Sequence, residues 1–218
     1  MKYGFIKTAL CTPELKTGAV SRNVERIKEW ISAAAAKKAE IIIFGENAVT
    51  GFGLGSMANY STVLSAAKDA VAEIAEFSKT LQSLIILGFP LRAEGKTTSA
   101  AALISGGKIY AVETKAFSDG TLEIGSQTVS VSNCKPYVLP NFSAAIEICF
   151  GERFDETCDI TDRFGFNGAK MIIDVSAGEN LIGSLKYRAE KAKYLSARLK
   201  CAYVYVSTFG EKAVAEND

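Results

Sequence analysis

The fold and chemistry of this chain depend on the stretch Ser143-Ala-Ala-Ile-Glu-Ile-Cys149-Phe-Gly-Glu-Arg153. Its first half predicts a buried strand, because Ile146 and Ile148 are apolar and isoleucine is favoured on a pleated surface. Cys149 follows where that strand runs out into a loop, so its thiol would be held rigidly and still be reachable by a substrate. A second interpretation stays open, since a free cysteine is often a small buried hydrophobe.

Composition narrows the class of protein. A chain of 218 residues, 48% apolar and 22% charged, has ordinary globular usage and can bury a substantial core. The net charge of +1, with acids and bases interspersed, argues against a binder of nucleic acid or of another polyanion. No apolar run is long enough to span a membrane, and residues 3–10 suggest a first strand and not a signal peptide.

Cysteine and histidine usage limits the chemistry further. Five cysteines at irregular spacings, with no CxxC pair, predict neither a disulfide framework nor a zinc site, and they suit a reducing cytoplasm. The chain has no histidine, which excludes Ser-His-Asp and Cys-His catalysis and histidine-ligated metals within it. If Cys149 is a nucleophile, its base must be a carboxylate or a lysine.

Strands alternate with helices along the chain and predict an α/β domain with a mixed sheet. Periodicity predicts one helix from Ser21 or Asn23, a second from Ser61, and a third over residues 185–200 with Leu185, Leu195 and Leu199 in the core. A short helix is expected over 160–166, a hairpin turn at 105–107, and a long polar loop over 118–136. The remaining segments are expected to be strands, over residues 3–10, 40–44, 84–88 (closed by Pro90), 143–149, 169–175 and 201–206.

Three polar residues stand where predicted strands end. Glu46 follows the run 40–44, Lys115 follows the second strand of the hairpin, and Cys149 ends the strand 143–149. Taken singly, Glu46 suits a solvated loop carboxylate and Lys115 a surface lysine, which are the commoner cases. Their recurrence at strand ends is what suggests a shared site.

The segments around these residues match known motifs. They stand as Phe44-Gly-Glu46-Asn-Ala-Val-Thr50-Gly51-Phe52, Gly107-Lys-Ile-Tyr-Ala-Val-Glu-Thr-Lys115 and Glu147-Ile-Cys149-Phe-Gly-Glu-Arg153. In this order they resemble the nitrilase (carbon-nitrogen hydrolase) superfamily, and the chain is most similar to the glutaminase domain of glutamine-dependent NAD synthetases. The resemblance implies one domain over residues 1–218, folded as a four-layer α-β-β-α sandwich with mixed sheets.

The resemblance also implies a role for each residue. Cys149 would attack the amide and form a thioester, and Glu46 would act as the base. Lys115 and the backbone N–H of Phe150 would stabilise the oxyanion. Phe52 would wall the substrate pocket, and Glu123 is the candidate for a second glutamate that some members carry. No metal is expected.

The sequence departs from the family pattern in several places. Gly45 replaces the usual proline before the glutamate, and Gly151 stands where an acid is common after the cysteine. The chain has no SGGxDS phosphate loop, so ATP and deamido-NAD would bind a synthetase domain, fused or separate, and no cofactor is expected here. The C-terminal end looks incomplete, which predicts a fragment of a longer enzyme or missing loops. Superfamily membership implies a homo-oligomer.

Three functions remain open from the sequence. The first is a cytoplasmic glutaminase that supplies ammonia to a synthetase making NAD. The second is a stand-alone amidase acting on another small amide. The third is an inactive scaffold that kept the fold and lost catalysis.

Overall fold

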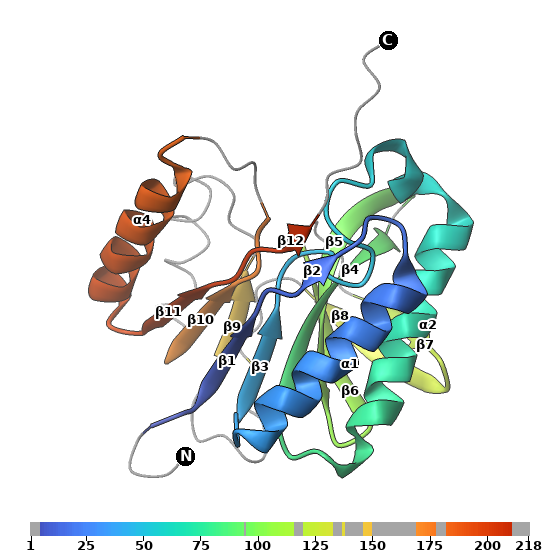
Figure 1. Cartoon of the computed structure of the whole chain (residues 1–218), viewed down its shortest axis with the longest axis horizontal. Helices are drawn as coiled ribbons and strands as arrows, with labels where there is room; N and C mark the ends of the chain where they lie inside the picture. Colours follow the sequence, from blue (N-terminus) through green and yellow to red (C-terminus); the bar gives the residue numbers. More distant parts are fainter. Residues whose placement is uncertain are drawn as a thin grey trace.

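Two β-sheets lie face to face between two helical layers (Figure 1). The structure, a computed structural model, describes residues 5–93, 95–115, 120–132, 137, 146–149, 169–177 and 182–210. The layers follow the order helix, sheet, sheet, helix, which confirms the four-layer α-β-β-α sandwich expected from the sequence.

The larger sheet has seven strands in the order β1-β3-β4-β5-β6-β8-β7. β1, β3 and β4 are parallel, whereas β5 runs antiparallel to both of its neighbours, β4 and β6, so the sheet is mixed. Its strands are β1 (Thr8–Cys11), β3 (Ile41–Phe44), β4 (Leu84–Ala93), β5 (Lys96–Ser105), β6 (Lys108–Thr114), β7 (Gly120–Ile124) and β8 (Gln127–Ser132).

Helices α1 (Val20–Ala36) and α2 (Ser61–Phe77) cover one face of this sheet. Each buries an apolar stripe at helical spacing, as the sequence predicted, and the stripe of α1 is Val24, Ile27, Ile31 and Ala34. β3 is buried on both faces, because Ile42 and Phe44 pack toward the helices while Ile41 and Ile43 pack toward the second sheet. Short 3₁₀ turns, η1 (Gly55–Asn59) and η2 (Ser78–Thr80), flank α2.

The second sheet contains, in its described part, three parallel strands in the order β11-β10-β9. They are β9 (Ile146–Cys149), β10 (Met171–Asp174) and β11 (Ala202–Tyr205). Ile148, Met171 and Ile173 face the first sheet, and α4 (Ser184–Leu199) packs on the other side through Leu195 and Leu199. A two-stranded parallel pair, β2 (Glu14–Leu15) with β12 (Phe209–Gly210), joins the end of the described chain to its start.

Two expectations from the sequence are wrong. The polar segment 118–136 is not a long loop, since β7 and β8 form an antiparallel hairpin that turns at Gly125, with φ of +57°. Alternation of polar residues with Ile124, Val129 and Val131, all buried, was the overlooked signal. Pro90 does not close its strand, since β4 continues to Ala93 and pairs with β3 only as far as Ile86, so the missing N–H of Pro90 interrupts no pairing with β3.

α4 also differs from its prediction. Leu195 is fully buried, but Leu185 is 80% exposed, and the second buried side chain of the helix is Lys191. Residues 143–145 of the strand expected over 143–149, the helix expected over 160–166, and Cys158 lie outside the described residues.

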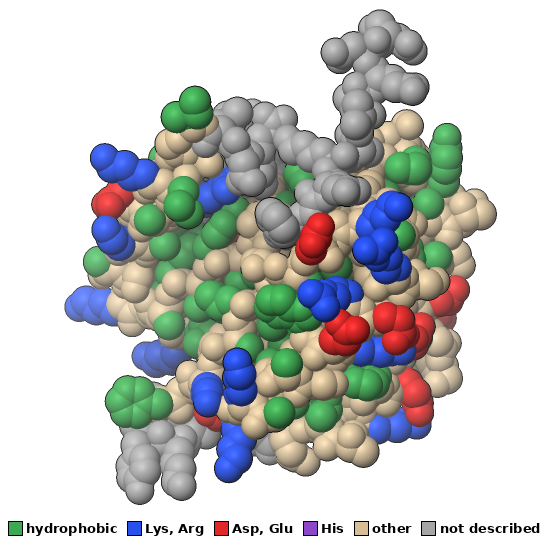
Figure 2. All heavy atoms as spheres, viewed as in Figure 1, with side chains coloured by type: hydrophobic (Ala, Val, Ile, Leu, Met, Phe, Trp, Pro, Cys, Tyr) green, Lys and Arg blue, Asp and Glu red, His purple; other side chains and the backbone are tan. Residues whose placement is uncertain are grey.

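The surface carries mixed charge. On the face drawn in Figure 2, acidic and basic side chains are intermingled over α1 and α2, whereas the charged side chains over α4 are mostly basic. The ion pairs of α1 include Arg26 with Glu29, and Lys28 with Glu73 of α2. The part of this face over α1 and α2 has no single-sign stripe of the kind that binds a polyanion. In the described part of the chain, no helix is both long and apolar enough to cross a membrane.

Candidate active site

Glu46 lies in a tight turn at the end of β3. Two glycines make room for this turn: a Cβ on Gly88 would lie 2.2 Å from the Gly45 carbonyl oxygen, and a Cβ on Gly45 would lie 2.5 Å from the Ser207 carbonyl carbon. Asn47 adopts a φ of 54°, a left-handed conformation that asparagine tolerates better than most residues. Glycine at position 45, where the family usually has proline, therefore leaves room for the backbone of the segment that follows β11.

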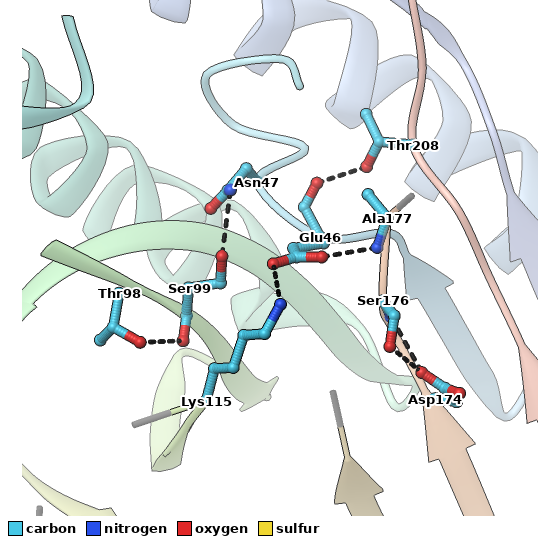
Figure 3. A network of polar contacts seen from close by, with 9 residues as sticks. All are labelled: Glu46, Asn47, Thr98, Ser99, Lys115, Asp174, Ser176, Ala177 and Thr208. Carbon is cyan, nitrogen blue, oxygen red and sulfur yellow. Dashed lines mark hydrogen bonds and ion pairs between the residues drawn. The ribbon is translucent and has the colours of Figure 1, made fainter. Parts of the chain in front are cut away.

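The Glu46 carboxylate is buried, with 3% of the residue exposed, and each of its oxygens has its own partner (Figure 3). Oε1 lies 3.6 Å from the Lys115 ammonium nitrogen, and Oε2 accepts a hydrogen bond from the Ala177 backbone N–H at 2.5 Å. The Thr208 hydroxyl donates to the Glu46 carbonyl oxygen at 2.5 Å. Two segments distant in sequence thus hold the carboxylate, and a third holds the backbone of the same residue.

Lys115 follows directly on β6. Its backbone N–H donates to the Ser99 carbonyl oxygen at 2.9 Å, which extends the pairing of β6 with β5 up to the lysine. The side chain points toward Glu46 and remains 32% exposed, so its ammonium is anchored beside a buried charge and can still meet a solute.

Cys149 is the last residue of β9, and its side chain lies outside what the structure describes. The backbone nevertheless locates it, because Cys149 is in register with Asp174 on the parallel strand β10. Adjacent strands are about 4.8 Å apart and three residues span at most about 11 Å, so the Cα of Cys149 lies within about 16 Å of that of Ala177. Ala177 itself contacts Glu46.

The three candidate substrate-binding residues lie in different places. Phe52 is half-buried beside the turn that carries Glu46, and its carbonyl accepts a hydrogen bond from Thr17. Phe150 lies outside the described residues. Glu123 does not join Glu46 and Lys115: it is exposed on the edge strand β7, where its carboxylate accepts a hydrogen bond from Thr128 at 2.6 Å. The hairpin register explains this, since Thr128 lies four residues before the end of β8, about 13 Å along the strand from the level of Glu113.

The sequence analysis missed a buried carboxylate two residues before Lys115. Glu113 is 1% exposed, and its Oε1 accepts hydrogen bonds from the Ser132 hydroxyl at 2.8 Å and from the Tyr137 hydroxyl. Ala111 faces the second sheet, and period-two alternation puts Glu113 and Lys115 on that same face of β6. That alternation was the signal that could have identified Glu113.

The arrangement brings together a buried carboxylate, a partly exposed ammonium and one backbone donor. The two charges keep the local charge near neutral, and a partly buried ion pair interacts more strongly than one in water. No group of three or more potential metal ligands occurs in the described residues. The Glu46 carboxylate can take and return a proton, and the Lys115 ammonium can stabilise a developing negative charge.

Comparison with known proteins identifies the family. The carbon-nitrogen hydrolase family profile matches residues 7–180. The chain belongs to the carbon-nitrogen hydrolase family. The three strand-end residues Glu46, Lys115 and Cys149 all fall within the matched part.

Several relatives and solved structures are similar to this carbon-nitrogen hydrolase. A glutamine-dependent NAD(+) synthetase of Mycobacterium bovis is 23% identical over 94% of the chain and 33% of its own length. A crystal structure of a glutamine-dependent NAD(+) synthetase from Cytophaga hutchinsonii superposes with a TM-score of 0.80, at 20% identity, over 95% of this chain and 37% of the other. An amidase from Nesterenkonia sp. AN1 gives a TM-score of 0.72 at 13% identity, over 94% and 79%. The chain spans about a third of the length of the curated relatives it matches.

Proposed function

We propose that this chain is a glutaminase that hydrolyses the side-chain amide of glutamine through a thioester on Cys149. The ammonia released would amidate deamido-NAD on an ATP-dependent synthetase domain, fused or separate. Glu46 is the general base, and Lys115 with the Phe150 N–H stabilises the oxyanion.

The observation that carries this proposal is the contact of 3.6 Å between Lys115 and the buried carboxylate of Glu46, near the end of β9. Amide hydrolysis needs a nucleophile, a group that takes and returns a proton, and a donor for the oxyanion. In a chain without histidine, a carboxylate beside an ammonium can supply the last two.

The reaction then proceeds in two balanced steps. Glu46 takes the thiol proton while the sulfur of Cys149 attacks the amide carbon. The proton passes to the leaving nitrogen, the C–N bond breaks, and ammonia departs. Glu46 next deprotonates a water that attacks the thioester carbon, and the departing thiolate recovers the proton to leave a carboxylic acid and a free thiol. Each oxyanion donor contributes a factor of about 10²–10³ to kcat.

The names of the similar proteins support glutamine as the substrate. The curated proteins that match 94% of the chain are named glutamine-dependent NAD(+) synthetases, and a synthetase superposes well on the fold. The chain corresponds to about a third of the length of these synthetases.

A stand-alone amidase is the second candidate. The likeness to the Nesterenkonia amidase supports this candidate, since the two folds superpose with a TM-score of 0.72 over 94% of this chain and 79% of the amidase. In one mutant of that amidase, with a glutamate changed to glutamine, acrylamide has added to the active-site cysteine. Short aliphatic amides are therefore the alternative substrates.

Ammonia release from glutamine, acetamide and acrylamide by the purified chain tests these proposals. Release from glutamine with little from the other two is the expected result, and release from the short amides alone would favour the amidase. Cys149→Ala should abolish turnover, whereas Cys11→Ala, which changes a buried thiol next to α1, should retain it. Full turnover by Cys149→Ala would refute the catalytic assignment, and no release from any amide would favour the inactive scaffold.

A further inference from the structure

An ion pair that is buried on both sides lies on the far side of the second sheet. Asp174, the last residue of β10, is fully buried, and the ammonium nitrogen of Lys191 on α4 lies 3.5 Å from its Oδ2. The same Oδ2 accepts a hydrogen bond from the Tyr203 hydroxyl of β11 at 2.7 Å. The amide-hydrolysis mechanism uses none of these three side chains directly.

Burying such a pair gives little stability. Removing two charges from water costs several kcal/mol per ion, and well-packed apolar residues often do as well in the same space. Lys191 occupies the inward face of α4 with only 5% of its side chain exposed, next to the fully buried Leu195. A role in orienting neighbouring groups therefore accounts for the Asp174–Lys191 pair better than a contribution to stability.

The other oxygen of Asp174 holds the turn that follows β10. Oδ1 accepts hydrogen bonds from the Ser176 backbone N–H at 3.0 Å and from the Ser176 hydroxyl. The next residue, Ala177, donates its N–H to Glu46 (Figure 3). Ser176 and Ala177 are both almost fully buried, so bulk solvent has little access to these bonds.

We propose that Asp174, Lys191 and Tyr203 are positioning residues for Glu46. Lys191 and Tyr203 fix the Asp174 carboxylate, Asp174 fixes the turn, and the turn presents the Ala177 N–H to the Glu46 carboxylate. The inference rests on the proposed function, because Glu46 is taken as the base for Cys149. It assigns to α4 and β11 a role in the orientation of a group on the opposite sheet.

Lys191→Met tests the proposal, with Lys193→Met as the matched control. Lys193 is on the same helix, but its side chain is 72% exposed and pairs with Glu190.

Two measurements test these variants: amide hydrogen exchange of Ala177, and the rate at which iodoacetamide alkylates Cys149, both measured on peptides by mass spectrometry. A displacement of about 1 Å in a reacting group can cost a factor of about 10². Lys191→Met should therefore slow alkylation by 10- to 100-fold and speed exchange at Ala177, whereas Lys193→Met should stay within twofold of wild type on both.

A milder variant protects the test from misfolding. Tyr203→Phe removes one hydroxyl, and it should slow alkylation two- to tenfold, whereas Tyr194→Phe on the outer face of α4 should not. In a Glu46→Gln background, Lys191→Met should slow alkylation by less than twofold further, because its effect passes through Glu46. A purely structural role would instead give additive losses.

The outcomes separate this inference from the proposed function. If Lys191→Met and Tyr203→Phe leave Ala177 exchange and Cys149 alkylation within twofold of wild type, the positioning role is overturned while the proposed function stands. If Glu46→Gln does not slow alkylation, the assigned base is wrong. The exchange readout still tests the positioning role in that case, since it involves no chemistry at Cys149.

Discussion

Gly88→Ala should inactivate the enzyme without touching a reacting group. The new Cβ would lie 2.2 Å from the Gly45 carbonyl oxygen, 2.8 Å from the Asn47 nitrogen and 2.9 Å from the Glu46 Cα. All three are backbone atoms, so no side chain can rotate away. Restoring an ordinary contact of 3.4 Å requires the turn to move by about 1.2 Å.

A displacement of this turn would lower the rate of catalysis. Glu46 would leave its hydrogen bond to Ala177 and its contact with Lys115, and a misplacement of about 1 Å costs a factor of about 10² in rate. Overpacking of this kind lowers the free energy of unfolding by about 1–3 kcal/mol, which leaves a protein of ordinary stability folded. The expected result is a folded protein with kcat reduced at least 100-fold.

Gly120→Ala is the matched control, since a Cβ there meets no atom of the described residues within 4 Å. Steady-state ammonia release gives kcat and KM, and urea unfolding gives the stability of each variant. The reasoning is refuted if Gly88→Ala folds and keeps kcat within threefold of wild type, or if Gly120→Ala loses as much.

Three further predictions follow from the described contacts. Lys115→Met should lower kcat by about 10²–10³ in the ammonia assay, whereas Lys108→Met at the exposed start of β6 should not; equal effects would contradict an oxyanion role. Burial raises the pKa of the Cys11 thiol from 9.0 to about 11. Between these values the folded state binds the proton and the unfolded chain does not, so this site should lower the free energy of unfolding by about 2–3 kcal/mol as pH rises from 9 to 11. Cys11→Ala should remove that part of the pH dependence in urea unfolding, and an unchanged dependence would oppose it. Ile86→Ala, between the sheets, should cost about 2–5 kcal/mol by chemical denaturation, whereas the fully exposed Ile182→Ala should cost almost nothing.

Local signals in the sequence were reliable where burial and period agree. The continuous run at 40–44 predicted a strand buried on both faces, and the stripe from Val24 to Ala34 predicted α1. These signals gave wrong predictions where a contact with a residue distant in sequence altered the environment of a side chain or strand. Pro90 lies inside β4 because β3 no longer pairs there, and Leu185 is exposed while Lys191 is buried, since Asp174 gives that lysine a partner inside.

The sequence by itself determined the fold class, the order of strand-end residues Glu46, Lys115 and Cys149, and the exclusion of histidine chemistry. Composition, hydrophobic periodicity and motifs can each be read from residues that are close together in the sequence. Only the tertiary structure decided that Lys115 meets Glu46, that Ala177 and Thr208 hold it, and that Glu123 lies elsewhere. The reason is physical: such contacts join residues 69 to 162 positions apart, and their geometry depends on how two sheets pack and how strands register.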